Sequence, residues 1–207
     1  MAIIMSATLM LASCTRGTEN SIETEGMSQV ENSKMQARHS IASDENVIAY
    51  FKNQKNFINQ NEDREEIFIL AEEGIEGNQE RFYSALNTNE AEYHQYIETQ
   101  RSLSTYIEEA YHLNELDTEV RAEILLPIIA EIYPEVIAET NSDCKGVYFA
   151  KLALNASVAY GAHVACLVAD VTVIVGALCH SAVLVGQIAA NYIALDEYKT
   201  CIKPKDD

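Results

Sequence analysis

The sequence contains no tryptophan, and it has only three prolines and eight glycines among its 207 residues. Proline and glycine are the residues that turns depend on, so this composition argues against a turn-rich β fold. Glutamate, alanine, isoleucine and leucine are frequent, and a composition of this kind favours helices. The length suits one domain of ordinary size with additional tails. We therefore expect an all-α protein.

Basic residues are also scarce, because 14 Lys and Arg stand against 32 Asp and Glu, for a formal net charge of −18. An acidic surface repels the phosphates of nucleic acids and anionic lipid headgroups. We therefore expect no nucleic-acid partner. No pattern pairs a nucleophile with a general base. We expect a non-enzymatic protein with no catalytic residue and no cofactor.

The amino terminus is a short apolar run, MAIIMSATLM, that leads into Leu11-Ala12-Ser13-Cys14. This ending resembles the lipobox of bacterial lipoproteins. The resemblance implies that residues 1–13 are a signal peptide and that Cys14 carries lipid, for example palmitate. It also implies an exported protein, anchored to a membrane of the cell envelope and facing the periplasm or the surface. The alternative is an apolar N-terminal helix with a buried Cys14, since no Lys or Arg precedes the run as in usual export signals.

The segment that follows, residues 14–42, is polar and small with no sustained hydrophobic period. Such a segment has too little apolar surface to offset the entropy lost on ordering. We expect a flexible tether that links the lipid-bearing end to an all-α domain spanning residues 43–207.

The first part of that domain, residues 43–142, shows acidic amphipathic patterns with helix start and stop signals. Gly74 and Gly77 are expected to close one helix. Pro127 and Pro134 are expected to bend or break another, because proline lacks a backbone donor and crowds the preceding turn. The expected helix starts are Ser43–Asn46, Thr88 and Asp117.

The same helices carry the candidate metal ligands of the chain. Glu90 shares a helix face with His94, Glu108 shares one with His112, and Glu109 lies three residues before His112. A di-metal carboxylate bundle needs a Glu-x-x-His motif on each of two helices, and only one is present here. A solvated acidic helix face explains these residues, so we expect no metal site.

The chain becomes almost uncharged from Gly146 to Leu195, where Lys151 and Asp170 are the exceptions. The stretch Val171–Leu195 is long enough to cross a bilayer as a helix, which is one interpretation. Polar side chains spread through both halves would need partners in lipid. They are Asn155, Ser157, His163, Thr172, His180, Gln187 and Asn191. Because the upstream amphipathic helices need an apolar partner, we favour a protein core.

Besides Cys14 the chain has four cysteines, with 21, 12 and 21 residues between them in turn. The pairs Cys144/Cys201 and Cys166/Cys179 therefore share one midpoint, between Thr172 and Val173. An antiparallel helical hairpin that turns there would bring both pairs together, and about six helical turns separate the cysteines within each arm, so they share a face. Of the three possible pairings, this symmetry selects nested disulfides. Asp170 and Thr172 lie at this expected turn and are available to cap the ends of the two helices.

Zinc binding by His163, Cys166, Cys179 and His180 is an alternative to the inner disulfide. It is disfavoured because adjacent residues on a helix point about 100° apart, and because it leaves the outer pair unexplained. An exported compartment also favours disulfides. Small residues recur every fourth position on both arms and allow close helix packing. They are Ala153, Ser157, Gly161, Ala165 and Ala169 on the first arm, and Ala182, Gly186, Ala190 and Ala194 on the second.

We therefore expect a helical bundle built on a C-terminal antiparallel hairpin, residues 144–201, stapled by two nested disulfides. The function expected from these features is that of a non-enzymatic, envelope-anchored lipoprotein that binds or shields an unknown protein partner. The alternative is a bacteriocin-like precursor, whose apolar stapled hairpin is released by proteolysis to act on membranes.

Overall fold

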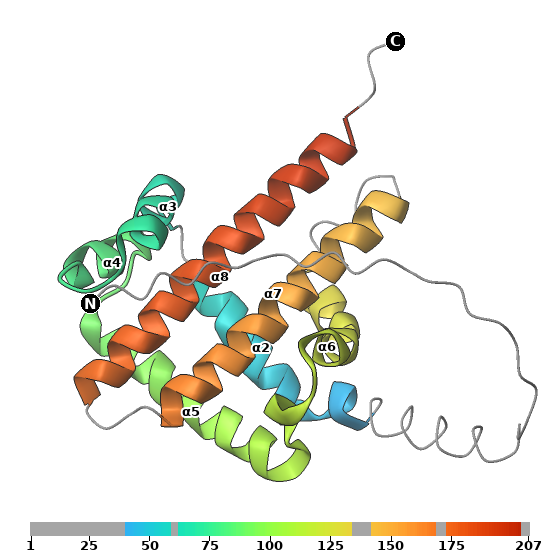
Figure 1. Cartoon of the computed structure of the whole chain (residues 1–207), viewed down its shortest axis with the longest axis horizontal. Helices are drawn as coiled ribbons and strands as arrows, with labels where there is room; N and C mark the ends of the chain where they lie inside the picture. Colours follow the sequence, from blue (N-terminus) through green and yellow to red (C-terminus); the bar gives the residue numbers. More distant parts are fainter. Residues whose placement is uncertain (1–39, 59–61, 134–141, 169–172, 204–207) are drawn as a thin grey trace, which may run out of the picture. The chain divides into compact units, whose positions relative to one another are not determined.

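The computed structural model describes residues 40–58, 62–133, 142–168 and 173–203 (Figure 1). No strand occurs among these residues, and the predicted all-α class is confirmed. The predictions for Cys14, for residues 1–39 and for Pro134, Asp170 and Thr172 fall outside the described residues. The helices are α2 (Glu45–Ile58), α3 (Arg64–Glu73), α4 (Gln79–Ala85), α5 (Glu90–Tyr111), η1 (Leu113–Glu115), α6 (Thr118–Ile132), α7 (Ser142–Val168) and α8 (Val173–Cys201).

Helices α2, α3 and α5 each start after a short polar residue whose side chain accepts a hydrogen bond from the first turn. Asp44 Oδ1 accepts from the backbone N–H of Asn46 at 2.7 Å and so caps α2. The start of α5 differs from the expected one, because Asn89 and not Thr88 is the N-cap and accepts from the N–H of Glu92. The Thr88 hydroxyl instead donates to the Glu92 carboxylate at 3.0 Å. Thr88 and Asn89 are both residues that can cap the start of α5, and the sequence pattern does not show which of them does so.

Two other boundaries differ from the sequence-based expectation. Helix α6 continues through Pro127, which was expected to bend or break it. Pro127 lies on the exposed side of the helix, where a carbonyl that loses its N–H partner can bond to water. At the other end of the domain, residues 40–43 are already helical and Ile41 is buried at 7% exposure. The described helical residues therefore include positions 40–42, which precede the expected boundary at residue 43.

Two apolar clusters form the interior, and the α7–α8 pair contributes to both. In the first, α7 packs against α2, α6 and the end of α8, around the fully buried rings of Tyr50 and Tyr160. In the second, the middle of α8 packs against α3, α4 and α5, around Phe82, Tyr93 and Leu184. The uncharged C-terminal segment therefore supplies the apolar surface that the acidic helices need.

The α7 and α8 helices lie side by side and are bonded to each other at both ends (Figure 1). Cys144, near the start of α7, is bonded to Cys201 at the end of α8, with Cα atoms 5.9 Å apart. Cys166, near the end of α7, is bonded to Cys179 near the start of α8, with Cα atoms 5.7 Å apart. Both separations lie in the range that disulfides require, and the expected presence of disulfides is confirmed.

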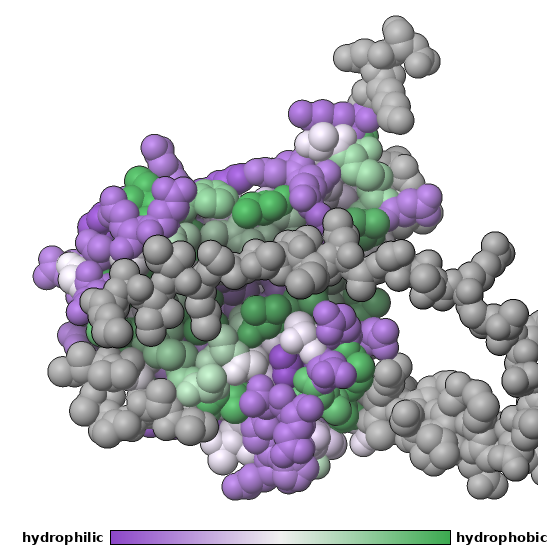
Figure 2. Space-filling model, viewed as in Figure 1, coloured by the Kyte–Doolittle hydropathy of each residue, from purple (hydrophilic) through white to green (hydrophobic). Residues whose placement is uncertain are grey.

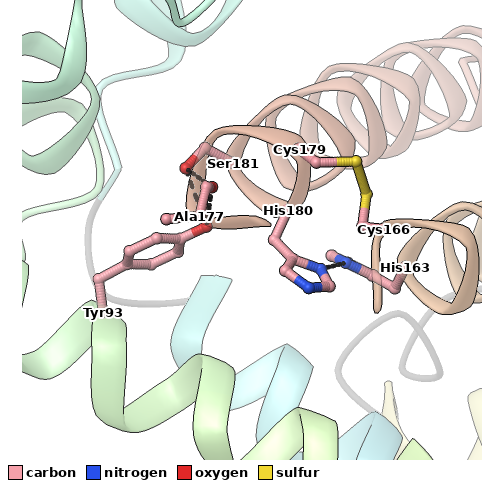
Figure 3. Close-up of a disulfide and its surroundings, with 7 residues drawn as sticks. All are labelled: Tyr93, His163, Cys166, Ala177, Cys179, His180 and Ser181. Atoms are coloured by element: carbon pink, nitrogen blue, oxygen red, sulfur yellow. Dashed lines mark hydrogen bonds between the residues drawn. A yellow bond between two sulfur atoms is a disulfide. The ribbon is translucent and has the colours of Figure 1, made fainter. Parts of the chain in front are cut away.

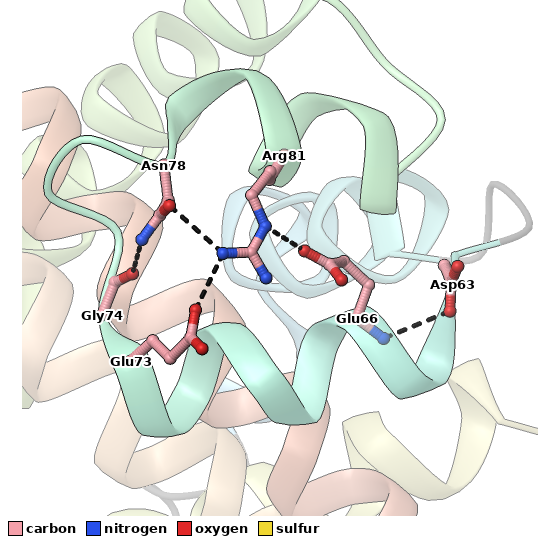
Figure 4. A network of polar contacts seen from close by, with 6 residues as sticks. All are labelled: Asp63, Glu66, Glu73, Gly74, Asn78 and Arg81. Carbon is pink, nitrogen blue, oxygen red and sulfur yellow. Dashed lines mark hydrogen bonds and ion pairs between the residues drawn. The ribbon is translucent and has the colours of Figure 1, made fainter.

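The α3 and α4 helices are joined by a polar network centred on Arg81 (Figure 4). Arg81 Nε donates to Glu66 at 2.6 Å and Nη1 donates to Glu73 at 2.8 Å. Asn78 links this network to the helix end, because its side chain donates to the carbonyl of Gly74 at 3.0 Å. Gly74 has a positive φ of 87°, so the glycine predicted to close this helix occupies a conformation that favours glycine.

The two disulfides should differ in their contribution to stability. They close loops with sequence separations of 57 and 13 residues. In the chain-entropy description the longer loop stabilises by about 4 kcal/mol and the shorter by about 3 kcal/mol. The double variant Cys144→Ser/Cys201→Ser should therefore lose more unfolding free energy than Cys166→Ser/Cys179→Ser in urea denaturation followed by circular dichroism. The reverse order would contradict this account.

Candidate functional site

Two shallow grooves follow the exposed side of the α7–α8 pair, and we call this surface the seam. The groove along the middle of the pair has a volume of about 340 Å³, and the groove near the Cys144–Cys201 end has about 300 Å³. The seam is lined mainly by small and apolar side chains: Val147, Val158, Ala162, Ala182, Gly186, Ala190 and Ala194. Figure 2 shows apolar surface in the region of α7 and α8.

Large apolar side chains on the α7–α8 pair reach solvent. Val147, Val158 and Ile193 are 58%, 56% and 52% exposed. Charged groups lie near one end, where Lys151 of α7 and Glu197 of α8 form an ion pair. A contiguous apolar surface with a polar rim is typical of an interaction site.

The stripes of small residues face different neighbours on the two helices. On α8, Ala182 and Gly186 are exposed and line the seam. On α7, Ser157 and Gly161 face α6 instead, because a Cβ added to Gly161 would lie 2.9 Å from Nη2 of Arg121. Gly161 therefore permits a close approach of α6 that a larger residue would obstruct.

Arg121 is a buried cation, 4% exposed, that joins α6, η1 and α7. Its Nε donates to the hydroxyl of Ser157 at 2.9 Å, and its Nη1 donates to the carbonyl of Leu113 at 3.3 Å. Burial lowers the pKa of Arg121, while Tyr160 and Glu108 act in the opposite direction. The Tyr160 hydroxyl donates to Glu108 at 2.5 Å, and the guanidinium of Arg121 lies 5.9 Å from the centroid of the Tyr160 ring. Tyr160 therefore holds a carboxylate in the neighbourhood of this cation.

Near the opposite end of the seam lies a second buried polar group, which we call the inner cluster: His163, Cys166, Cys179 and His180 (Figure 3). The Nδ1 atoms of the two histidines are 2.8 Å apart, and their rings stack with centroids 5.1 Å apart. Both histidines are only 4% exposed. Burial, reinforced by the neighbouring His180, lowers the pKa of His163 to about 3. His163 is therefore neutral at pH 7. A single proton lies between the Nδ1 atoms of His163 and His180 and forms the hydrogen bond that joins them.

Helix α5 fixes the start of α8 next to this cluster (Figure 3). The Tyr93 hydroxyl donates to the carbonyl of Ala177 at 3.2 Å and accepts a hydrogen bond from Ser181 at 2.8 Å. Burial raises the pKa of Tyr93, so its hydroxyl keeps the proton that it donates. His180 lies between Ala177 and Ser181 in the sequence, so these bonds position its backbone.

One described stretch, Gly176–Cys201, is long and apolar enough to cross a bilayer. A core helix of a folded domain has the same length and composition, so this property does not separate the two cases. Within the described residues, Gln187 exchanges two hydrogen bonds with Gln54 of α2, at 2.7 and 3.2 Å. Such amide contacts are those of a helix packed inside a domain.

The sequence-based metal candidates do not converge in the described part of the chain. His94 lies 3.7 Å from Glu90, and His112 lies 3.7 Å from Glu115 instead of Glu109. These pairs are exposed, and with the four cysteines bonded as disulfides the described residues contain no group of three or more ligands that could hold a metal ion. Glu108 accepts hydrogen bonds from Tyr160 and from the backbone of Asn114, a structural role.

Acid should destabilise the fold through His163. Its pKa is about 3 in the folded chain against an ordinary value of 6.5, so between these values the unfolded chain binds more protons. The free energy of unfolding therefore falls as pH drops below 6.5, by up to about 1.4 kcal/mol per pH unit from this group. Urea midpoints from pH 7.5 to 4.5 would measure the slope.

The variant His163→Gln should reduce this slope, because it removes the buried titrating group. The matched control is His94→Gln, since His94 lies on the exposed side of α5 with a side chain 41% exposed. An unchanged slope in His163→Gln, or an equal reduction in both variants, would show that His163 does not carry the acid sensitivity.

Comparison with models of protein families, with curated proteins and with solved structures found no match. The seam, the buried Arg121 and the inner cluster are therefore the features on which a function can be based.

Proposed function

We propose that this chain is a non-enzymatic lipoprotein of the bacterial cell envelope, anchored through Cys14, which binds or shields a protein partner on the seam. In this proposal α7 and α8 act as one antiparallel hairpin that presents the seam as a rigid surface. The single observation that carries the binding role is the exposed apolar surface of Val147, Val158 and Ile193 on a chain of net charge −18.

The anchoring part of the proposal rests on the sequence and on the disulfides. Leu11-Ala12-Ser13-Cys14 resembles a lipobox at the end of an apolar run. Disulfides persist in oxidising compartments such as the periplasm and the cell surface, and the four remaining cysteines are all bonded. An exported, lipid-anchored protein accounts for both observations.

The binding part rests on the chemistry of the seam. In the described residues from Leu152 to Leu195, α7 and α8 carry no formally charged side chain. An uncharged surface avoids the repulsion that the acidic helices would cause at an acidic partner. The two disulfides reduce the flexibility of the two helices, so less entropy is lost when a partner binds.

A second candidate function is a bacteriocin-like precursor. It is favoured by one observation: both disulfides lie within residues 144–201, so one cut between α6 and α7 would release these helices as a single covalent unit. The bonds from Arg121 to Ser157 oppose this release, because they would have to break. A discrete C-terminal fragment in culture medium would favour the precursor, whereas an intact membrane-bound chain would favour the binding protein.

The anchor can be tested by fractionation. Mature protein should begin at Cys14, carry lipid and sediment with membranes, whereas Cys14→Ser should be found in the soluble fraction. Thr18→Ser serves as the control, because it lies after the motif and keeps both Leu11-Ala12-Ser13 and the Cys14 sulfur that accepts lipid. A Cys14→Ser protein that still sediments with membranes in full would contradict lipid anchoring through this residue.

The seam can be tested with a photo-reactive amino acid placed singly at Val147 or Val158 in the full chain. Irradiation of intact cells should produce a discrete cross-linked species at both positions, because these side chains lie on the exposed side of the α7–α8 pair. Leu126 of α6 is the matched control, since it is apolar and 36% exposed but lies outside the seam.

The mass of the cross-linked species distinguishes the outcomes. A discrete mass larger than that of one chain, and formed only from the seam positions, supports a specific protein partner. Equal cross-linking from Leu126, or none from either seam position, would contradict binding at the seam.

A further inference from the structure

The inner cluster contains two nitrogen and two sulfur donors in one buried place (Figure 3). His163 and Cys166 lie three residues apart on one face of α7, and Cys179 and His180 are adjacent on α8. Although adjacent helical residues diverge, the Nδ1 atom of His180 reaches within 2.8 Å of that of His163. The helix geometry therefore does not keep the two imidazoles apart in the folded chain.

The second ring nitrogen of His163 adds an independent observation. Nε2 of this residue is buried and has no hydrogen-bond partner among the described residues. A buried polar atom without a partner costs free energy, about 1–3 kcal/mol. In the oxidised chain this cost is set against the hydrogen bond between the two Nδ1 atoms.

The cluster is held in place by contacts that do not involve the disulfide. On α7, Ser157 is bound by Arg121 through its hydroxyl and its carbonyl. On α8, Ala177 and Ser181 are bound by Tyr93. Because these contacts lie within about two turns of the cluster on each helix, the four side chains should stay near one another when the sulfur–sulfur bond is broken.

We propose that the inner cluster is a redox-controlled metal site, in which reduction of Cys166–Cys179 creates a tetrahedral site for one zinc-like divalent cation. A dithiol reductant gives two electrons and two protons to the bond, is itself oxidised to a disulfide, and leaves two thiols. Zn²⁺ then binds both thiolates and both neutral imidazoles, and two protons pass to solvent. The proton between the two Nδ1 atoms moves to an Nε2 atom.

Two separations in the inner cluster can be compared with those of a tetrahedral zinc site. Zinc binds imidazole nitrogen at about 2.0–2.1 Å, which places two nitrogen ligands about 3.3 Å apart at a tetrahedral ion. The two Nδ1 atoms therefore have to separate by about 0.5 Å from the 2.8 Å of the oxidised chain. Zinc–sulfur distances of about 2.3 Å place the sulfurs about 3.7 Å apart, which side-chain rotation can provide once the bond is broken. Two nitrogen and two thiolate ligands are a donor set that structural zinc sites use.

The proposal is tested on the full chain with Co²⁺ as a spectroscopic probe. After reduction with a phosphine and its removal without air, the chain should bind one Co²⁺ with the absorption bands of a tetrahedral ion and a sulfur-to-cobalt charge-transfer band. Zn²⁺ should displace the cobalt and raise the melting temperature of the reduced chain. The oxidised chain should show none of these effects.

Variants assign the ligands. Cys166→Ser should abolish the charge-transfer band or shift it strongly, and His163→Gln or His180→Gln should weaken metal binding at least about tenfold. The matched control is Cys144→Ser/Cys201→Ser, which removes the outer cysteines and should keep the complete cobalt spectrum. Far-UV circular dichroism is recorded throughout, and if reduction melts helix, Zn²⁺ should restore it.

Three results would overturn the proposal. The first is a reduced chain that binds no stoichiometric Co²⁺, whether folded or not. The second is equal affinity in the double variant His163→Gln/His180→Gln, which would assign the metal to the thiolates alone. The third is a cobalt spectrum that is lost in the outer-cysteine control.

Discussion

The two sulfur–sulfur bonds fix the register of α7 against α8, and the remaining packing depends on that register. A shift of one helix by a single residue would rotate its side chains by about 100°. Gln187 would then turn away from Gln54, and Ser181 from Tyr93. The bonds are placed at both ends of the pair, so neither end can slide. Helices α2, α3 and α5 can therefore pack against a surface whose geometry is already defined.

The same arrangement explains how a strongly acidic chain keeps an apolar exposed surface. The inward sides of α7 and α8 fill both apolar clusters, while the seam is left with small side chains and a few exposed branched ones. Small residues allow close backbone packing without a large apolar protrusion. The surface is thus apolar but shallow, which suits a partner that presents its own side chains.

The features that could be predicted from the sequence are those that periodic spacing encodes. The cysteine spacing gave a shared midpoint, and amphipathic periods gave helices with starts near Asp44 and Asp117. Arg121 could not be identified, because one basic residue in an acidic helix has no pattern that marks it as buried. The choice of Asn89 instead of Thr88 as the N-cap of α5 depends on backbone angles that the sequence does not specify. Helix α6 continues through Pro127 because that side of the helix faces water. The contact between His163 and His180 required the three-dimensional crossing of the two helices.

The paired amides of Gln54 and Gln187 connect residues that are 133 positions apart in the chain. During synthesis, α2 emerges from the ribosome long before α8 exists, so its buried amide must remain solvated until nearly the whole chain has been made. The packing of α2 against its neighbours can therefore be completed only after the last helix of the domain has been made.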